Sequence, residues 1–178
     1  NHITIFFSYF YSIEKFFHEE GSIGEIGLST RKRKHKVMKT KAAVLYEMGL
    51  TRPFTGSNPL KVEELTLDPL GINEVVVKIK AVGLCHSDLS VIDGNRPRPL
   101  PMVLGHEAAG EVIELGSRVK KLKIEDHVIF TFLPSCGSCN YCQTGRAALC
   151  EPGAKANGDG TLLAGHQRIH KKGSYYYH

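Results

Sequence analysis

Residues 105–119 read Gly-His-Glu-Ala-Ala-Gly-Glu-Val-Ile-Glu-Leu-Gly-Ser-Arg-Val, and they contain both a strand signal and a candidate metal ligand. The segment 110–115 is rich in β-branched and other apolar residues and is followed by Gly116, which predicts a strand that ends in a turn. His106 comes shortly before this strand, and histidine is a good zinc ligand. The stretch therefore predicts a strand with a possible metal ligand close to its beginning.

Upstream of this stretch, residues 83–88 read Gly-Leu-Cys-His-Ser-Asp and supply a second possible ligand, Cys85. A short helix is expected after Cys85, with Ser87 or Asp88 near its start and Gly94 beyond its end. Two ligands do not complete a zinc shell, so the pair Cys85 and His106 needs further ligands. Without more context, a cysteine and a histidine this far apart are more often ordinary core residues.

Downstream, four cysteines have the spacing C-x2-C-x2-C-x7-C: Cys136, Cys139, Cys142 and Cys150. Four thiolates fill a tetrahedral zinc shell and leave no position for water or substrate, so such a site is structural. The intervening residues are mostly small and polar, and a metal is needed to hold them together. An iron–sulfur cluster and free or disulfide-bonded thiols are the alternatives. The fourth cysteine is followed by Glu151 rather than by the proline typical of ferredoxins, which favours zinc.

The rest of the chain from residue 38 onward has short β-rich segments separated by glycine and proline, which is typical of a barrel or sandwich. Further strands are expected at 75–79 and 127–132. In the first of these, alternation places Val75, Val77 and Ile79 on one face and Val76 and Lys78 on the other. No stretch reaches the roughly eighteen apolar residues of a membrane helix.

The chain has 178 residues, 42% of them hydrophobic, and a net charge of +5. Residues 31–41 contain seven lysines and arginines, so the remainder of the chain is net negative. A basic run can be a nuclear address or a nucleic-acid patch, but it is usually a solvated segment, and nucleic-acid binding is not expected. An odd number of cysteines, five, argues against a secreted disulfide framework and favours metal-bound thiols in the cytoplasm.

Residues 1–37 differ in composition from the rest of the chain and are expected to be an atypical leader, disordered or not native, with Met38 as the true start. Their glycines at 21, 24 and 27 do not have the GxGxxG spacing of a dinucleotide fold, and no such motif occurs elsewhere in the chain. Residues 38–178 form the expected domain, which we predict to be incomplete at its C-terminal end.

The three motifs, in this order and spacing, resemble those of the zinc-dependent alcohol dehydrogenases, members of the medium-chain dehydrogenase/reductase superfamily. The resemblance extends over residues 38–178. It implies a mainly β fold, a GroES-like and partly open β-barrel with short helices and a zinc-bound cysteine lobe.

The resemblance also implies a role for individual residues. Cys85 and His106 match two ligands of a catalytic zinc, and Glu107 matches the adjacent carboxylate that can join its shell. Asp88 matches the carboxylate that orients the histidine ligand. Ser87 matches the hydroxyl that takes the alcohol proton, and His86 matches a basic position that meets the cofactor pyrophosphate.

Three features depart from the family pattern. Ser90 stands where many members have a histidine that ends the proton relay, so water or Asp93 is expected to serve there. Glu125 stands where a glycine is common, which affects a turn and not the chemistry. The third catalytic zinc ligand, usually a cysteine further along the family's chain, has no candidate among the five cysteines.

The complete enzyme implied by the resemblance holds two zinc ions per subunit and forms a homo-oligomer. It oxidises an alcohol to an aldehyde or ketone, or the reverse, by zinc-assisted hydride transfer to NAD or NADP. Residues 93–103 would line the cleft for this small-molecule substrate. The competing hypotheses are a stand-alone zinc-binding module and a non-catalytic remnant, and this chain alone is expected to be inactive.

Overall fold

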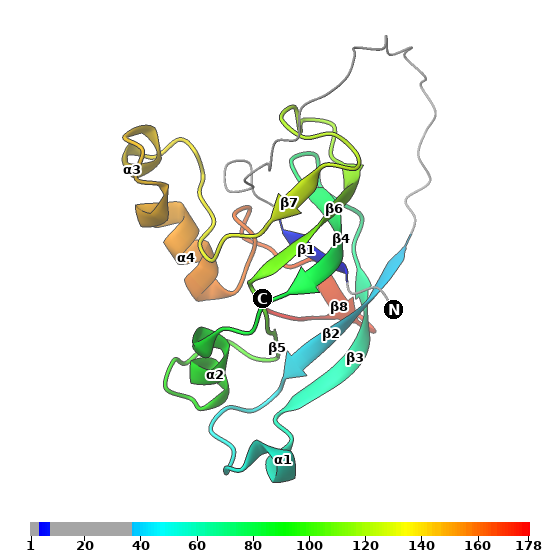
Figure 1. Cartoon of the computed structure of the whole chain (residues 1–178), viewed down its shortest axis with the longest axis vertical. Helices are drawn as coiled ribbons and strands as arrows, with labels where there is room; N and C mark the ends of the chain where they lie inside the picture. The colour runs from blue at the N-terminus through cyan, green and yellow to red at the C-terminus, as the bar shows by residue number, and fades with distance from the viewer. Residues whose placement is uncertain (1–3, 8–36) are drawn as a thin grey trace.

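A computed structural model describes residues 4–7 and 37–178, which form two antiparallel sheets and several short helices (Figure 1). The first sheet has the order β1 (Thr4–Phe7), β4 (Val75–Val82), β6 (Ala108–Leu115), β7 (His127–Ile129). The second has the order β5 (Met102–Val103), β2 (Met38–Leu45), β3 (Leu60–Leu67), β8 (Ile169–Lys171), β9 (Ser174–Tyr175). The helices are α1 (Phe54–Ser57), α2 (His86–Ile92), α3 (Asn140–Gln143), a 3₁₀ turn at Ala147–Leu149, and α4 (Glu151–Asp159). The expected mainly β, partly open barrel with short helices is confirmed.

Strand β4 is buried on both of its faces, and this joins the two sheets. Val76 packs with residues of the second sheet, including Val44, Leu65 and Ile169. The residues on the opposite face of β4 pack within the first sheet: Val75, Val77 and Ile79 contact Val112 and Val128. The alternation predicted from the sequence is confirmed, and each fully buried valine contributes roughly 1.5 to 3 kcal/mol of stability through the hydrophobic effect.

Two glycines of the 105–119 stretch are required by the backbone. Gly110 pairs with Ile79 across the β4–β6 ladder, and a Cβ added to it would lie 2.5 Å from the carbonyl oxygen of Lys78. Gly105 has φ of 117°, a conformation that residues with a side chain rarely adopt. The chain can therefore turn sharply just before His106 and then enter β6 without a clash.

The local predictions have mixed outcomes. Helix α2 begins directly after Cys85, and Gly94 follows its end with φ of 78°, as predicted. Strand β7 ends at Ile129 rather than at residue 132, because the chain then leaves the sheet toward the cysteine lobe. Helix α4 was not predicted, although a proline in its first turn and a left-handed Gly160 at its end are ordinary helix signals.

The N-terminal segment is described only in part. Thr4–Phe7 pairs antiparallel with Val75–Lys78 at the edge of the first sheet. The basic run, the spaced glycines and the rest of the proposed leader lie outside the described residues or at their border. The division of the chain at residue 38 stays a prediction.

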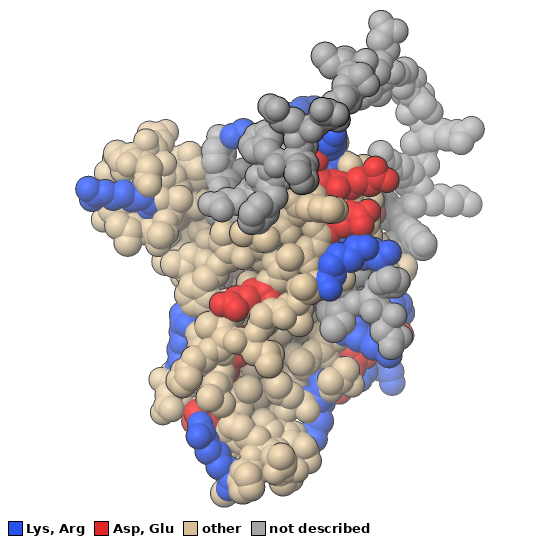
Figure 2. Space-filling view, in the orientation of Figure 1, with Lys and Arg blue, Asp and Glu red and all other residues tan. Residues whose placement is uncertain are grey.

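The charges of the described part are mixed rather than segregated. On the face shown in Figure 2, lysines and arginines are scattered, and several lie beside acidic residues. Ion pairs such as Lys80 with Glu111 and Lys171 with Glu63 belong to this pattern. Within residues 4–7 and 37–178, no helix has both the length and the apolar character needed to cross a membrane.

Candidate metal and catalytic sites

The four predicted cysteines converge in a lobe built from α3, the 3₁₀ turn and the start of α4. The sulfur atoms of Cys136, Cys139, Cys142 and Cys150 all lie within 4.8 Å of one another, and none forms a disulfide. Ligands at the usual zinc–sulfur distance in a tetrahedron are about 3.8 Å apart, so this cluster is close to the geometry that zinc needs. The donor set therefore fits a saturated structural ion.

The cysteine thiols differ strongly in acidity. Hydrogen bonds from the backbone and hydroxyl of Ser138 lower the pKa of Cys136 to about 6. Burial, followed by contact with the other cysteines, raises the pKa of Cys142 to about 12. Four sulfurs this close repel one another when ionised, and a divalent cation among them removes that conflict.

The lobe is anchored by close packing around Cys150. The buried sulfur of Cys150 accepts hydrogen bonds from the backbone of Cys136 at 3.2 Å and of Gly153 at 3.3 Å. A Cβ on Gly153 would lie only 1.7 Å from the carbonyl oxygen of Pro134. Helix α4 can therefore approach the incoming chain only because position 153 has no side chain.

The second cluster contains the predicted trio of Cys85, His106 and Glu107, whose potential ligand atoms also lie within 4.8 Å of one another. The β4–β6 ladder explains why residues about twenty positions apart meet. Val82 pairs with Ala108, and the Gly83 backbone N–H donates to the Glu107 carbonyl at 2.8 Å. The chain beyond β4 and the chain before β6 therefore run side by side, with α2 inserted between them in sequence.

Ser87 and Asp88 hold the ligand atoms from the first turn of α2. The Ser87 hydroxyl donates to the Cys85 sulfur at 3.2 Å and lies 3.2 Å from His106 Nε2. The other ring nitrogen of His106, Nδ1, lies 3.2 Å from Asp88 Oδ1. The structure therefore places all of these predicted residues together, with the two ring nitrogens engaged on opposite sides.

His86 lies at the exposed side of the same helix and does not contact the ligand cluster. Its Nδ1 lies 3.4 Å from the hydroxyl of Ser90, the position at which a relay histidine is common in the family. Asp93, the other candidate for the end of the relay, is instead ion-paired with Arg52.

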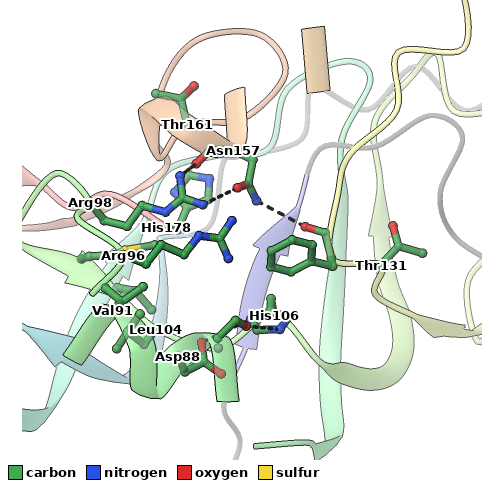
Figure 3. A pocket seen from close by; sticks show the side chains of 15 residues that line it. Asp88, Val91, Arg96, Arg98, Leu104, His106, Thr131, Asn157, Thr161 and His178 are labelled. Carbon is green, nitrogen blue, oxygen red and sulfur yellow. Dashed lines mark hydrogen bonds and ion pairs between the residues drawn. The ribbon is translucent and has the colours of Figure 1, made fainter. Parts of the chain in front are cut away.

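A pocket opens beside Ser87 and His106, and several of its residues were not singled out from the sequence (Figure 3). The ring of Phe132 packs edge-on against His106, with centroids 4.9 Å apart. Arg96 and Arg98 come from the proline-rich segment 93–103, which was expected to line the cleft. Asn157 comes from α4. No sequence signal marks Phe132 or Asn157, because their distance from His106 in the chain hides the contact.

Comparisons with known proteins agree with this arrangement. Residues 71–175 match the alcohol dehydrogenase GroES-like domain family. The chain is 45% identical over 137 residues to a putative alcohol dehydrogenase D of Mycobacterium tuberculosis, covering 77% of this chain and 35% of that protein. It is also 45% identical over 139 residues to an NDMA-dependent alcohol dehydrogenase of Amycolatopsis methanolica, covering 78% and 35%.

A solved structure shares the fold. An alcohol dehydrogenase zinc-binding domain protein from Burkholderia ambifaria superimposes with a TM-score of 0.70 and 34% identity, covering 80% of this chain and 36% of that one. This chain thus spans about a third of the length of the relatives that it matches. The match over residues 71–175 confirms the resemblance drawn from the motifs. The chain therefore belongs to the zinc-type alcohol dehydrogenase family and contains its GroES-like domain.

Proposed function

We propose that this chain supplies the zinc-binding catalytic half of an alcohol dehydrogenase. The observation that carries the proposal is the position of the Ser87 hydroxyl, within 3.2 Å of both the Cys85 sulfur and His106 Nε2. This position supports Ser87 as the hydroxyl that accepts a proton beside the two proposed zinc ligands. Bound zinc would act there as a Lewis acid on the oxygen of an alcohol.

The donor set of the trio supports this assignment. A thiolate, an imidazole and a carboxylate are the ligand types that zinc takes in proteins, and three protein ligands leave a position open for substrate. We propose Cys85 and His106 as constant ligands and Glu107 as the carboxylate that joins them. The four-cysteine lobe would hold the second, structural ion.

The remaining residues of α2 orient the ligands and move the proton. The Nδ1–H of His106 donates to Asp88, so Nε2 keeps its lone pair for the metal. Ser87 would relay the proton, accepting it from the alcohol while its own hydroxyl proton leaves toward solvent. Beyond Ser87, water would carry the proton to solvent, because Asp93 is ion-paired with Arg52.

The finer features of the complete enzyme are also proposals. NAD or NADP would accept the hydride, and His86 would meet the pyrophosphate because it is basic and exposed at the edge of the site. A homo-oligomer is expected. All five cysteines are free of disulfides, which supports a reducing compartment, and we propose the cytoplasm.

The test is a metal and activity analysis of residues 38–178 joined to the remaining part of the Amycolatopsis relative. Cys85→Ala or His106→Ala should remove one zinc, keep the lobe zinc and lower kcat by several orders of magnitude, because the Lewis acid is lost. Ser87→Ala should keep both zinc ions and lower kcat about a hundredfold, which is the usual size of a general acid–base contribution. Near-normal turnover of Cys85→Ala with a full metal complement would make Cys85 and His106 ordinary core residues.

A further inference from the structure

Two guanidinium groups line the pocket that also contains Ser87 and His106, one of the three proposed ligands. In Figure 3, Arg96 and Arg98 extend into one space, and His106 and Asp88 lie at its other end. The pocket is also lined by Asn157, which holds Arg98 in place. Arg96, Ser87 and His106 line the same hollow, so one bound molecule could contact all three.

Arg98 is fixed in position and brings positive charge with it. Its guanidinium donates to the backbone carbonyl of Asn157 at 2.8 Å and to the side-chain oxygen of Asn157 at 2.6 Å. Burial, and then the positive charge of Arg96, lower the pKa of Arg98. The two cations are therefore close enough to repel each other, and an anion between them would relieve that repulsion.

Arg96 is the guanidinium that is available to a ligand. Its central carbon lies 5.1 Å from the centroid of the Phe132 ring, a cation–π distance, and the same ring packs against His106 at 4.9 Å. The Phe132 ring thus contacts both the cation and the proposed metal ligand. The Arg96 guanidinium makes no hydrogen bond to another described residue, so its N–H donors are free for an acceptor.

The side chains of the pocket supply no ion-pair partner for these cations. Within residues 4–7 and 37–178, no ion pair involves Arg96 or Arg98. Asp88 carries the sole side-chain carboxylate among the described residues that line this pocket, and it is engaged with His106 Nδ1. No side-chain carboxylate of the pocket therefore pairs with Arg96 or Arg98.

We infer that the substrates of this site are alcohols that carry an anionic group, such as a carboxylate, at the end remote from the reacting carbon. The hydroxyl end would lie beside Ser87 and the anionic end would accept hydrogen bonds from Arg96. This inference rests on the proposed alcohol dehydrogenase function and names its substrate class. Arg96 would be a specificity residue rather than a participant in the proton or hydride step.

The inference can be tested by binding to the full 178-residue chain loaded with zinc. The probes are 4-(hydroxymethyl)benzoate and its neutral isostere 4-(hydroxymethyl)benzamide, titrated while amide NMR signals around His106 and Phe132 are followed. We expect the benzoate to bind about tenfold more tightly or better, because hydrogen bonds to charged groups contribute that much. The preference should weaken as salt concentration rises.

Substitutions then assign the preference to one side chain. Arg96→Gln should abolish it, Arg96→Lys should retain part of it because the charge remains, and the exposed Arg118→Gln should leave it unchanged. Amide NMR spectra with the same chemical-shift dispersion as the parent chain will show that each variant is folded. Equal binding of the two probes, or a preference that survives Arg96→Gln because the benzoate carboxylate binds zinc directly, would overturn the inference. So would loss of inorganic pyrophosphate binding in Arg96→Gln without any probe preference, since the arginine would then serve the cofactor.

The outcome for the proposed function is separate. Zinc bound at Cys85 and His106 together with equal binding of the probes would leave the alcohol dehydrogenase proposal standing and remove only the substrate class. A benzoate preference in a chain whose Cys85–His106 site takes up no zinc would overturn both, and the pocket would then be a simple anion site.

Discussion

Replacement of Asp88 by asparagine tests whether the carboxylate beside His106 supports metal binding. Asparagine has the same shape and can still accept the hydrogen bond from Nδ1, so the change removes the negative charge and little else. Loss of such an orienting partner usually costs ten- to a hundredfold in metal affinity. The Nδ1–Oδ1 distance of 3.2 Å is at the long end of the hydrogen-bond range, and the two side chains are 17% and 18% exposed. We therefore expect Asp88→Asn to lower the metal affinity by about tenfold, the lower end of this range, which corresponds to about 1.4 kcal/mol.

The assay is a titration of the second metal equivalent into chain whose cysteine lobe is already filled. Cobalt is a suitable ion, since its thiolate complex absorbs visible light and reports on the Cys85 sulfur. Asp88→Ala should weaken binding further, toward a hundredfold, because the hydrogen bond is then lost together with the charge. In both variants the metal content of the lobe should stay unchanged.

Asp93→Asn is the matched control, because Asp93 caps the same helix and pairs with Arg52 rather than with a ligand. It should leave cobalt affinity at the second site unaltered. If Asp88→Asn binds cobalt as tightly as the parent chain, or if Asp93→Asn weakens binding equally, the orienting role of Asp88 is wrong and the effect is one of helix stability.

Three further outcomes are expected. The purified chain should hold about one zinc in its cysteine lobe after dialysis against a mild chelator, and plasma emission that finds iron, or no metal in folded protein, would contradict the structural-zinc assignment. Gly153→Ala should release that zinc at much lower chelator concentrations, because the added Cβ would lie 1.7 Å from the Pro134 carbonyl oxygen. The control is Ala154→Gly, at the next and exposed position of α4. Equal zinc retention by the two variants would refute the packing argument. Glu125→Gly should raise the free energy of unfolding by roughly 0.5 to 1 kcal/mol, because Glu125 has φ of 71° and glycine adopts this conformation without strain. Denaturant unfolding measures the change in the free energy of unfolding. As a control, Glu114→Gly in β6 should destabilise the domain. A lower free energy of unfolding for Glu125→Gly would show that the turn is not strained.

Much of the candidate site could be predicted from the sequence, because the chemistry of a ligand belongs to the residue itself. The thiolates of the lobe were identified by type and spacing, whereas the Cys85–His106 pair and the hydroxyl and carboxylate of α2 were assigned through the resemblance to a known family. The faces of β4 followed from alternation, and the end of α2 followed from a glycine. The residues that could not be found this way, such as Phe132 and Asn157, are of ordinary types in segments without a motif.

The sequence by itself determined which side chains can bind metal and where three strands of the first sheet lie, since periodicity and ligand chemistry are local properties. Only the tertiary structure decided that these atoms meet. Cys85 and His106 become neighbours because the β4–β6 register pairs Val82 with Ala108, and register is set by packing across the whole sheet. The cationic pocket likewise exists only after α4 is drawn beside residues 93–103, where Asn157 holds Arg98 and leaves Arg96 stacked on Phe132. Contacts between segments this far apart depend on the fold of the whole domain, and no local pattern in the chain records them.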